Sequence, residues 1–269
     1  MRSLALFPLT ALALAACAPK EALVTPPPVA AASPAPAPYA PVIPEGTGVF
    51  AQPSSLPFQA PDFSRIKDSD FQPAIEQGIA IKRAEIEAIA NNPEAPTFAN
   101  TLEAMERSGQ MLDRANAVFS ALTAANTNPT LDRIDSEIAP KLAALRDAIY
   151  LNDKLFARVK TLYDQRASLN LAPDQLRLLT LTHERFVQNG ALLDSAQKEQ
   201  LKALNGRIST LQTDFGQKLT AATRDAALVV DSKAKLAGLS PADIAAAAKA
   251  AEARELKGKY VLALQNTTQ

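Results

Sequence analysis

Apolar residues recur at intervals of three and four along most of this chain, and that spacing constrains the fold more than any other feature. The first apolar face carries Phe71, Ile75, Ile79, Ile86 and Ile89. The prolines of PEAP (93–96) should end that helix, because proline cannot continue the ladder of helical hydrogen bonds. The spacing predicts a mainly α-helical fold.

Asparagine, proline and glycine mark the ends of the next helices. A second helix should begin near 97–100, with Asn100 and Glu103 at capping-box spacing, and carry apolar residues as far as Leu122. A third should begin at Asn128-Pro129 and reach Ile149, with a kink at Pro140. Asn152 should cap a fourth helix, and a fifth should run from Ala172-Pro173 to Asn189-Gly190.

The longest periodic segment runs from about Ser195 to Ala226. Its apolar stripe consists of Leu201, Leu204, Ile208, Leu211, Phe215 and Leu219. Beyond it, 227–230 and 259–265 have the composition and alternation of short strands, and Ser240-Pro241 should begin one more helix. We therefore expect one or two short strands near the C-terminal end of a multi-helix body.

The first 17 residues, MRSLALFPLTALALAAC, have the pattern of a bacterial lipoprotein signal peptide. Arg2 precedes an apolar run from Leu4 to Ala16 that is too short for an ordinary membrane span. The run ends in LAAC, which resembles a lipobox, so Cys17 is the expected lipidation site. The alternative is an ordinary secretory signal followed by an incidental cysteine.

Residues 18–46 are rich in proline and alanine, which disfavours helix and predicts a disordered, extended tether. A recruitment motif for a proline-reading domain is the alternative interpretation. Residues 47–269 then form the helical body. Cys17 is the only cysteine, so once it is lipidated the body has no thiol for disulfides, zinc thiolates or nucleophilic catalysis.

Charge and composition exclude several functions. The chain has 28 basic and 28 acidic residues and no concentrated basic block, which argues against nucleic-acid binding. Tryptophan is absent, so stacking platforms for bases or sugars would be hard to build. A glycosidase that works with Asp and Glu alone stays open as a minor alternative.

The stretch THERFVQNG contains His183-Glu184, but Val187 occupies the position where a zincin motif places its second histidine. His183 is the only histidine, so neither a two-histidine zinc site nor a serine triad with another base can form. Glycine-rich phosphate loops are also absent from the sequence. We interpret His183 as part of the fifth helix, exposed or hydrogen-bonded to a neighbour, and predict no catalytic and no metal-binding residue in this chain.

Long phrases of the sequence resemble a known family. NNPEAPTFANT (91–101), IAPKLAALRDAIYLN (138–152) and the segments around them, from about Phe50 onward, are similar to the start of the peptidyl-dipeptidases called Dcp, or dipeptidyl carboxypeptidases. These belong with oligopeptidase A and thimet oligopeptidase to one zinc metallopeptidase family.

The resemblance implies the N-terminal lobe of a two-lobed, mainly helical enzyme with a deep channel that admits short peptides. Members of the Dcp type release C-terminal dipeptides, and their zinc is bound by HExxH and a later glutamate, downstream of the matched region. The chain itself would then bind no zinc and be inactive alone, with the missing C-terminal catalytic lobe as its partner. The lipid anchor would hold it in the envelope facing the periplasm. Ala18, where an aspartate would favour the inner membrane, points to the outer one.

A different interpretation is a complete, non-catalytic helical lipoprotein that acts as a binding or scaffolding module. The ending QNTTQ completes no helix, and the strand 259–265 has no obvious partner nearby in sequence. We therefore expect the chain alone to expose an apolar surface meant for the catalytic lobe.

Overall fold

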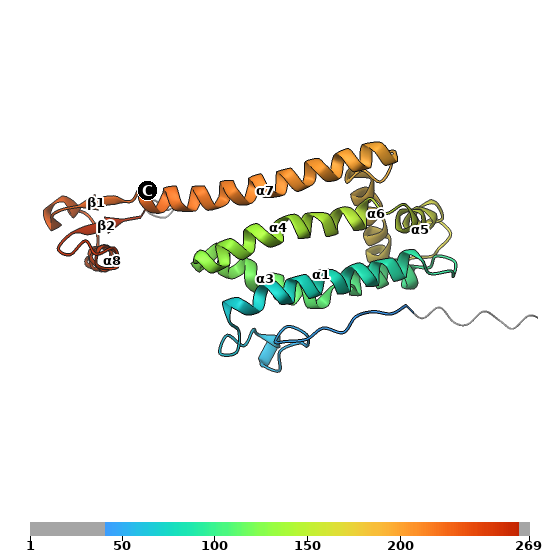
Figure 1. Ribbon diagram of the computed structural model, residues 1–269, viewed down its shortest axis with the longest axis horizontal. Helices are drawn as coiled ribbons and strands as arrows, with labels where there is room; N and C mark the ends of the chain where they lie inside the picture. Colours follow the sequence, from blue (N-terminus) through green and yellow to red (C-terminus); the bar gives the residue numbers. More distant parts are fainter. Residues whose placement is uncertain (1–40, 264–269) are drawn as a thin grey trace, which may run out of the picture. The chain divides into compact units, whose positions relative to one another are not determined.

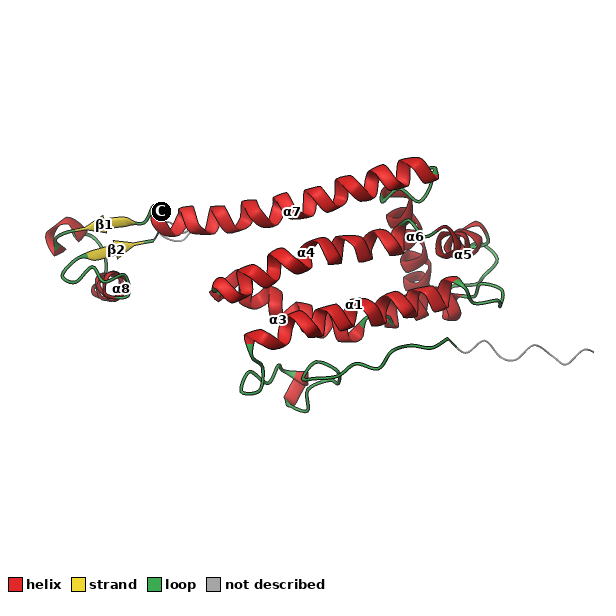
Figure 2. Ribbon diagram, viewed as in Figure 1, coloured by secondary structure: helices red, strands yellow, loops and turns green. Residues whose placement is uncertain are grey.

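The computed structural model describes residues 41–263 of the 269-residue chain (Figure 1). The signal peptide, Cys17 and most of the proposed tether lie outside the described residues. Helices dominate this range, with one pair of short strands toward its C-terminal end (Figure 2). The expectation of a mainly α fold is confirmed.

The elements follow the chain in a simple order. They are η1 (Pro57–Gln59), α1 (Asp68–Ala90), η2 (Phe98–Glu103), α2 (Ala104–Arg107), α3 (Gln110–Asn126), α4 (Pro129–Tyr150), α5 (Asp153–Asp164), α6 (Pro173–Gln188), α7 (Ser195–Asp225), β1 (Leu228–Val230), η3 (Lys233–Leu236), α8 (Pro241–Glu252) and β2 (Tyr260–Leu262).

Two helices begin where a side chain accepts hydrogen bonds from the first free backbone N–H groups of the helix. The side-chain oxygen of Asn128 accepts from the backbone N–H groups of Thr130 and Leu131 at 2.9 and 3.0 Å, which fixes the start of α4. Asn152 does the same for α5 through Leu155, at 3.0 Å. α4 continues as one helix through Pro140.

The second predicted helix is wrong in two respects. It is divided, because Gly109 has φ +84° and separates α2 from α3. The reciprocal cap is also formed by Thr97 and Asn100, not by Asn100 and Glu103. Thr97 lies one residue before the first turn, so its hydroxyl reaches the N–H of Asn100 while the Asn100 side chain reaches back. Six residues from Phe98 onward form a π-type turn.

A first hydrophobic core lies between α1, α3 and α4. Its largest fully buried members are Phe71, Ile75, Phe119, Leu131, Ile134 and Ile138. The Phe71 ring contacts Phe50 and Phe119, with centroids 5.5 and 5.4 Å apart. Ile43 also packs against this core, so the segment before η1 lies on the helices.

A second core is formed by the C-terminal end of α1, by η2 and by α5 and α6. Its fully buried members include Leu102, Leu155, Val159, Leu162, Leu179 and Phe186. Ile149 at the end of α4 contacts both cores. α1 therefore extends from one core to the other, and the apolar face predicted for it is the face that it buries.

α7 begins where predicted, with Asp194 as its cap, and packs along α4 (Figure 1). After it, β1 pairs antiparallel with β2, with Val229 opposite Val261. As expected, the strand within 259–265 has no partner nearby in sequence: β2 pairs with β1, more than 25 residues earlier, with α8 between them. In the range 41–263 no helix is both long and apolar enough to span a membrane.

The close contact of α1 and α3 generates a stability prediction. A Cβ on Gly78 would lie 2.7 Å from the Cα and 2.8 Å from the N of Leu112, so only glycine permits the contact. Gly78→Ala should lower the free energy of unfolding by about 1–3 kcal/mol in urea titrations, because backbone must move. Gly216→Ala in α7, with no atom within 4 Å of the new Cβ, should instead raise it by about 0.5–1 kcal/mol. Equal stability of the two variants would contradict the packing.

Candidate functional site

His183 lies on α6 in a stack of rings, as an ordinary helical residue. Its imidazole is parallel to the Tyr163 ring, with centroids 3.9 Å apart and an interplanar angle of 4°, and Phe156 lies 5.7 Å away. The Arg166 guanidinium lies 4.1 Å from the centre of the Tyr163 ring. The helical interpretation is confirmed, but the expectation of an exposed or hydrogen-bonded imidazole is corrected: the residue is half-buried, and its ring stacks on Tyr163.

Burial in this stack lowers the pKa of His183 below its usual 6.5. The charge of Asp164 opposes this shift, whereas Lys160 and Arg166 add to it. The neutral imidazole is therefore the form that suits the fold. A side chain held flat between rings is a packing element rather than a general base.

A zinc ion does not fit the described part of the chain. Between residues 41 and 263 there is no group of three or more His, Cys, Asp or Glu side chains that could hold a metal. His183 is stacked on Tyr163, and Val187, which packs against the second core, has no atom that can bind a metal.

Arg158 on α5 holds the loop that joins α1 to η2. Its side chain is 7% exposed, and one terminal nitrogen donates to the carbonyls of Asn92 and Glu94 at 2.9 and 3.0 Å. The other donates to the Asn100 side chain at 2.8 Å. Burial lowers the pKa of Arg158, with Glu94 acting in the opposite direction. This arginine gives the NNPEAPTFAN stretch a structural role.

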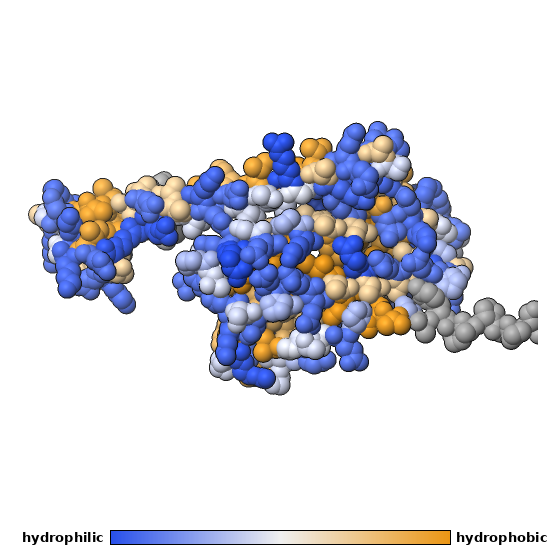
Figure 3. All heavy atoms as spheres, viewed as in Figure 1, coloured by the Kyte–Doolittle hydropathy of each residue, from blue (hydrophilic) through white to orange (hydrophobic). Residues whose placement is uncertain are grey.

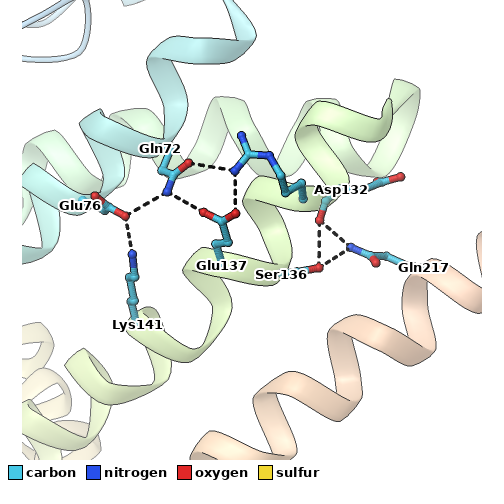
Figure 4. Close-up of polar contacts among 8 residues, drawn as sticks. Gln72, Glu76, Asp132, Ser136, Glu137, Lys141 and Gln217 are labelled. Atoms are coloured by element: carbon cyan, nitrogen blue, oxygen red, sulfur yellow. Dashed lines mark hydrogen bonds and ion pairs between the residues drawn. The ribbon is translucent and has the colours of Figure 1, made fainter.

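A polar network connects α1 and α4 at the surface (Figure 4). The Gln72 amide nitrogen donates to Glu76 at 3.3 Å and to Glu137 at 2.7 Å, and Glu137 accepts from Arg133 at 2.6 Å. Lys141 pairs with Glu76, and this hydrogen bond and that of Gln72 lower the pKa of the Glu76 carboxyl. The network fixes the register of the two helices above the first core.

α7 contacts α4 through polar groups. Gln217 donates from its amide nitrogen to the Asp132 carbonyl at 2.8 Å and to the Ser136 hydroxyl at 3.1 Å (Figure 4). Near the other end, Asn205 donates to the Asp147 carboxylate at 2.6 Å. Hydrogen bonds, rather than interlocking apolar side chains, therefore join these helices.

A cleft of about 480 Å³ lies where α3, α4 and α7 meet. Its walls include Thr123, Thr127, Asp132, Asp135, Gln212, Gln217 and Arg224. Burial raises the pKa of Asp135, and the neighbouring charge of Asp132 adds to the effect. Two carboxylates, several hydroxyls and one guanidinium make the wall of this cleft polar.

Five of the six residues in the apolar stripe predicted for α7 are exposed, and only Leu201 is half-buried. Relative exposures are 56% for Leu204, 48% for Ile208, 55% for Leu211, 67% for Phe215 and 54% for Leu219. The expectation that the chain exposes an apolar surface agrees with this finding. In Figure 3 apolar atoms reach the surface along α7. We call these five residues the α7 stripe.

The roles of Arg158 and of the polar residues between α4 and α7 were not predicted from the sequence. For Arg158 a signal exists: it lies three residues after Leu155, on the apolar face of α5, where a charge must find buried partners. For Gln217 and Asn205 no signal exists, because polar residues on a helix are usually solvated.

The stacked imidazole generates a pH prediction. Because the pKa of His183 is lower in the folded state than in the unfolded chain, the unfolded chain takes up more protons as the pH falls through about 6.5. Stability should thus be greater at pH 8 than at pH 5.5, with part of the difference due to this residue. Denaturant titrations of the His183→Gln variant should show a smaller difference between the two pH values. An unchanged difference would contradict the assignment.

The chain is similar to several proteins that are named as peptidases. No family model matches the chain. The dipeptidyl carboxypeptidase of Salmonella typhimurium is 49% identical over 216 residues, which cover 80% of this chain and 32% of that protein. The dipeptidyl carboxypeptidase of Escherichia coli is 46% identical over 220 residues, covering 82% of this chain and 32% of that protein.

Oligopeptidase A of Escherichia coli is more distant, at 25% identity over 217 residues, which cover 80% of this chain and 32% of that protein. The chain spans about a third of the length of the curated relatives it matches. Over most of its own length it is therefore a homologue of part of two proteins named dipeptidyl carboxypeptidase.

Proposed function

We propose that this chain is the N-terminal part of a zinc peptidase that releases dipeptides from the C-termini of short peptides. The observation that carries the proposal is the 49% identity to a dipeptidyl carboxypeptidase over 80% of the chain. Coverage of only 32% of that relative leaves ample length for a catalytic part outside this chain. The zinc ligands and the base that activates water would belong to that part.

In this proposal the chain contributes a rigid helical wall rather than reacting groups. The two cores and the polar network between α1 and α4 hold the helices in one arrangement, which a channel for short peptides requires. Its partners are the catalytic part and, in the assembled enzyme, peptide substrates. Alone, the chain would not hydrolyse peptides.

We also propose a location from the sequence of the first 46 residues. The lipobox and Cys17 would place a lipid anchor in the cell envelope, facing the periplasm and in the outer membrane. The proline-rich tether would separate the helical body from the lipid surface.

The proposed activity has a direct test. The source gene is sequenced past the codon for Gln269, and the product of the whole reading frame is assayed with a short N-blocked peptide. We expect an HExxH motif, release of the C-terminal dipeptide, loss of hydrolysis with a chelator and recovery with zinc. The 269-residue chain alone should be inactive.

A peptide with an amidated C-terminus serves as the control, because it lacks the terminal carboxylate. Cleavage from the N-terminus, or hydrolysis that resists chelation, would contradict the proposal. A stop codon directly after Gln269, with no hydrolysis, would favour the non-catalytic binding module instead.

The anchor has a separate test. Cys17→Ser should abolish incorporation of labelled palmitate in bacterial cells and release the protein from the membrane fraction, because the acceptor thiol is lost. Ala18→Ser, one residue away, should retain both label and membrane association. Equal labelling of the two variants would show that Cys17 is not the acceptor.

A further inference from the structure

α7 has two chemically different sides, and it turns the polar one toward the bundle. Asn205 and Gln217 bond α4, and Ser209 and Thr213 between them are half-buried. At 3.6 residues per turn these positions lie on one broad side of the helix, whereas the α7 stripe lies roughly 140° around it. A helix with a single apolar stripe ordinarily buries that stripe. α7 does the reverse.

The stripe is large and regular enough to be a contact surface. Five large apolar side chains, each about half exposed or more, span four turns on one side of the helix, and grouped exposed apolar side chains are typical of interaction sites. Their spacing of four, three, four and four residues matches the seam that one helix offers to another. Arg207, Asp214 and Lys218 are exposed and provide a charged edge, as at protein interfaces.

The length of the relatives indicates what covers the α7 stripe. This chain matches about a third of each dipeptidyl carboxypeptidase, so a large part of such a protein remains to cover exposed surface. We infer that the α7 stripe packs against an apolar helix of the catalytic part of the peptidase. The inference rests on the proposed function, and it specifies which surface of this chain joins the two parts.

The chain offers a clean experiment, because its only cysteine is Cys17. Leu211→Cys and Phe215→Cys place a thiol on the stripe, and Thr210→Cys places one on an exposed position of α7 away from it. Each variant is made in the protein from the whole reading frame, with its other cysteines replaced, and in the 269-residue chain. Labelling with a bulky maleimide is then timed.

In the longer protein the thiols at 211 and 215 should react about tenfold more slowly than the thiol at 210, or slower still, because a packed helix excludes the reagent. In the 269-residue chain all three should react at similar rates. Equal rates in the longer protein would overturn the inference. Protection at 211 in the 269-residue chain that increases with its concentration would also overturn it, since a second copy would be the occupant.

The hydrolysis assay on the same preparations separates the two proposals. Active enzyme with unprotected thiols at 211 and 215 would refute the interface and leave the proposed function standing. Inactive protein with protected thiols would refute the peptidase activity but retain the contact between the two parts. A reading frame that ends at Gln269 would remove the partner and refute both.

Discussion

α4 contacts its neighbouring helices through two different kinds of surface, and the arrangement of the whole bundle depends on that difference. Toward α1 and α3 it buries Leu131, Ile134 and Ile138 in the first core. Toward α7 it offers a carbonyl, a hydroxyl and the Asp147 carboxylate. Apolar burial supplies most of the stability on the first side, and hydrogen bonds fix position on the second. α7 is therefore held in place without burying its own apolar residues.

That division explains why the helices could be predicted and the orientation of α7 could not. Asn128 and Asn152 cap helices through local hydrogen bonds, so their roles are visible in a few consecutive residues. The stripe from Leu204 to Leu219 shows which side of α7 is apolar, but spacing alone cannot say what that side faces. The break at Gly109 escaped prediction because apolar spacing continues across it. There Glu85 on α1 accepts a 2.7 Å hydrogen bond from the Gly109 N–H, a contact invisible in local sequence.

In the candidate site too, local features could be predicted from the sequence and long-range contacts could not. The sequence excludes a two-histidine zinc site at His183, because Val187 cannot bind a metal and no second histidine exists. The remaining interpretation, an ordinary helical residue, is the one that the structure has. Its stacking on Tyr163 requires α5 and α6 to lie side by side, which depends on the second core. Arg158 could be predicted only in part. Its position on an apolar face indicates a buried charge, but its partners lie in a loop more than 50 residues earlier. Local chemistry is readable in sequence, whereas pairing across the fold is not.

The proposed role as one wall of a peptidase agrees with the contacts that the charged side chains make. Hydrolysis of a peptide bond needs an activated water and a polarised carbonyl, which demand clustered ligands or bases. Several titratable groups are engaged in structural contacts instead: Glu76 and Glu137 are paired, Arg158 is bound to carbonyls and His183 is stacked. Side chains held in such contacts stabilise the helical wall and are not free to act as acid, base or nucleophile. The α7 stripe remains exposed, and burying apolar surface is how one part of a protein joins another. What α7 leaves exposed is thus better suited to assembly than to chemistry.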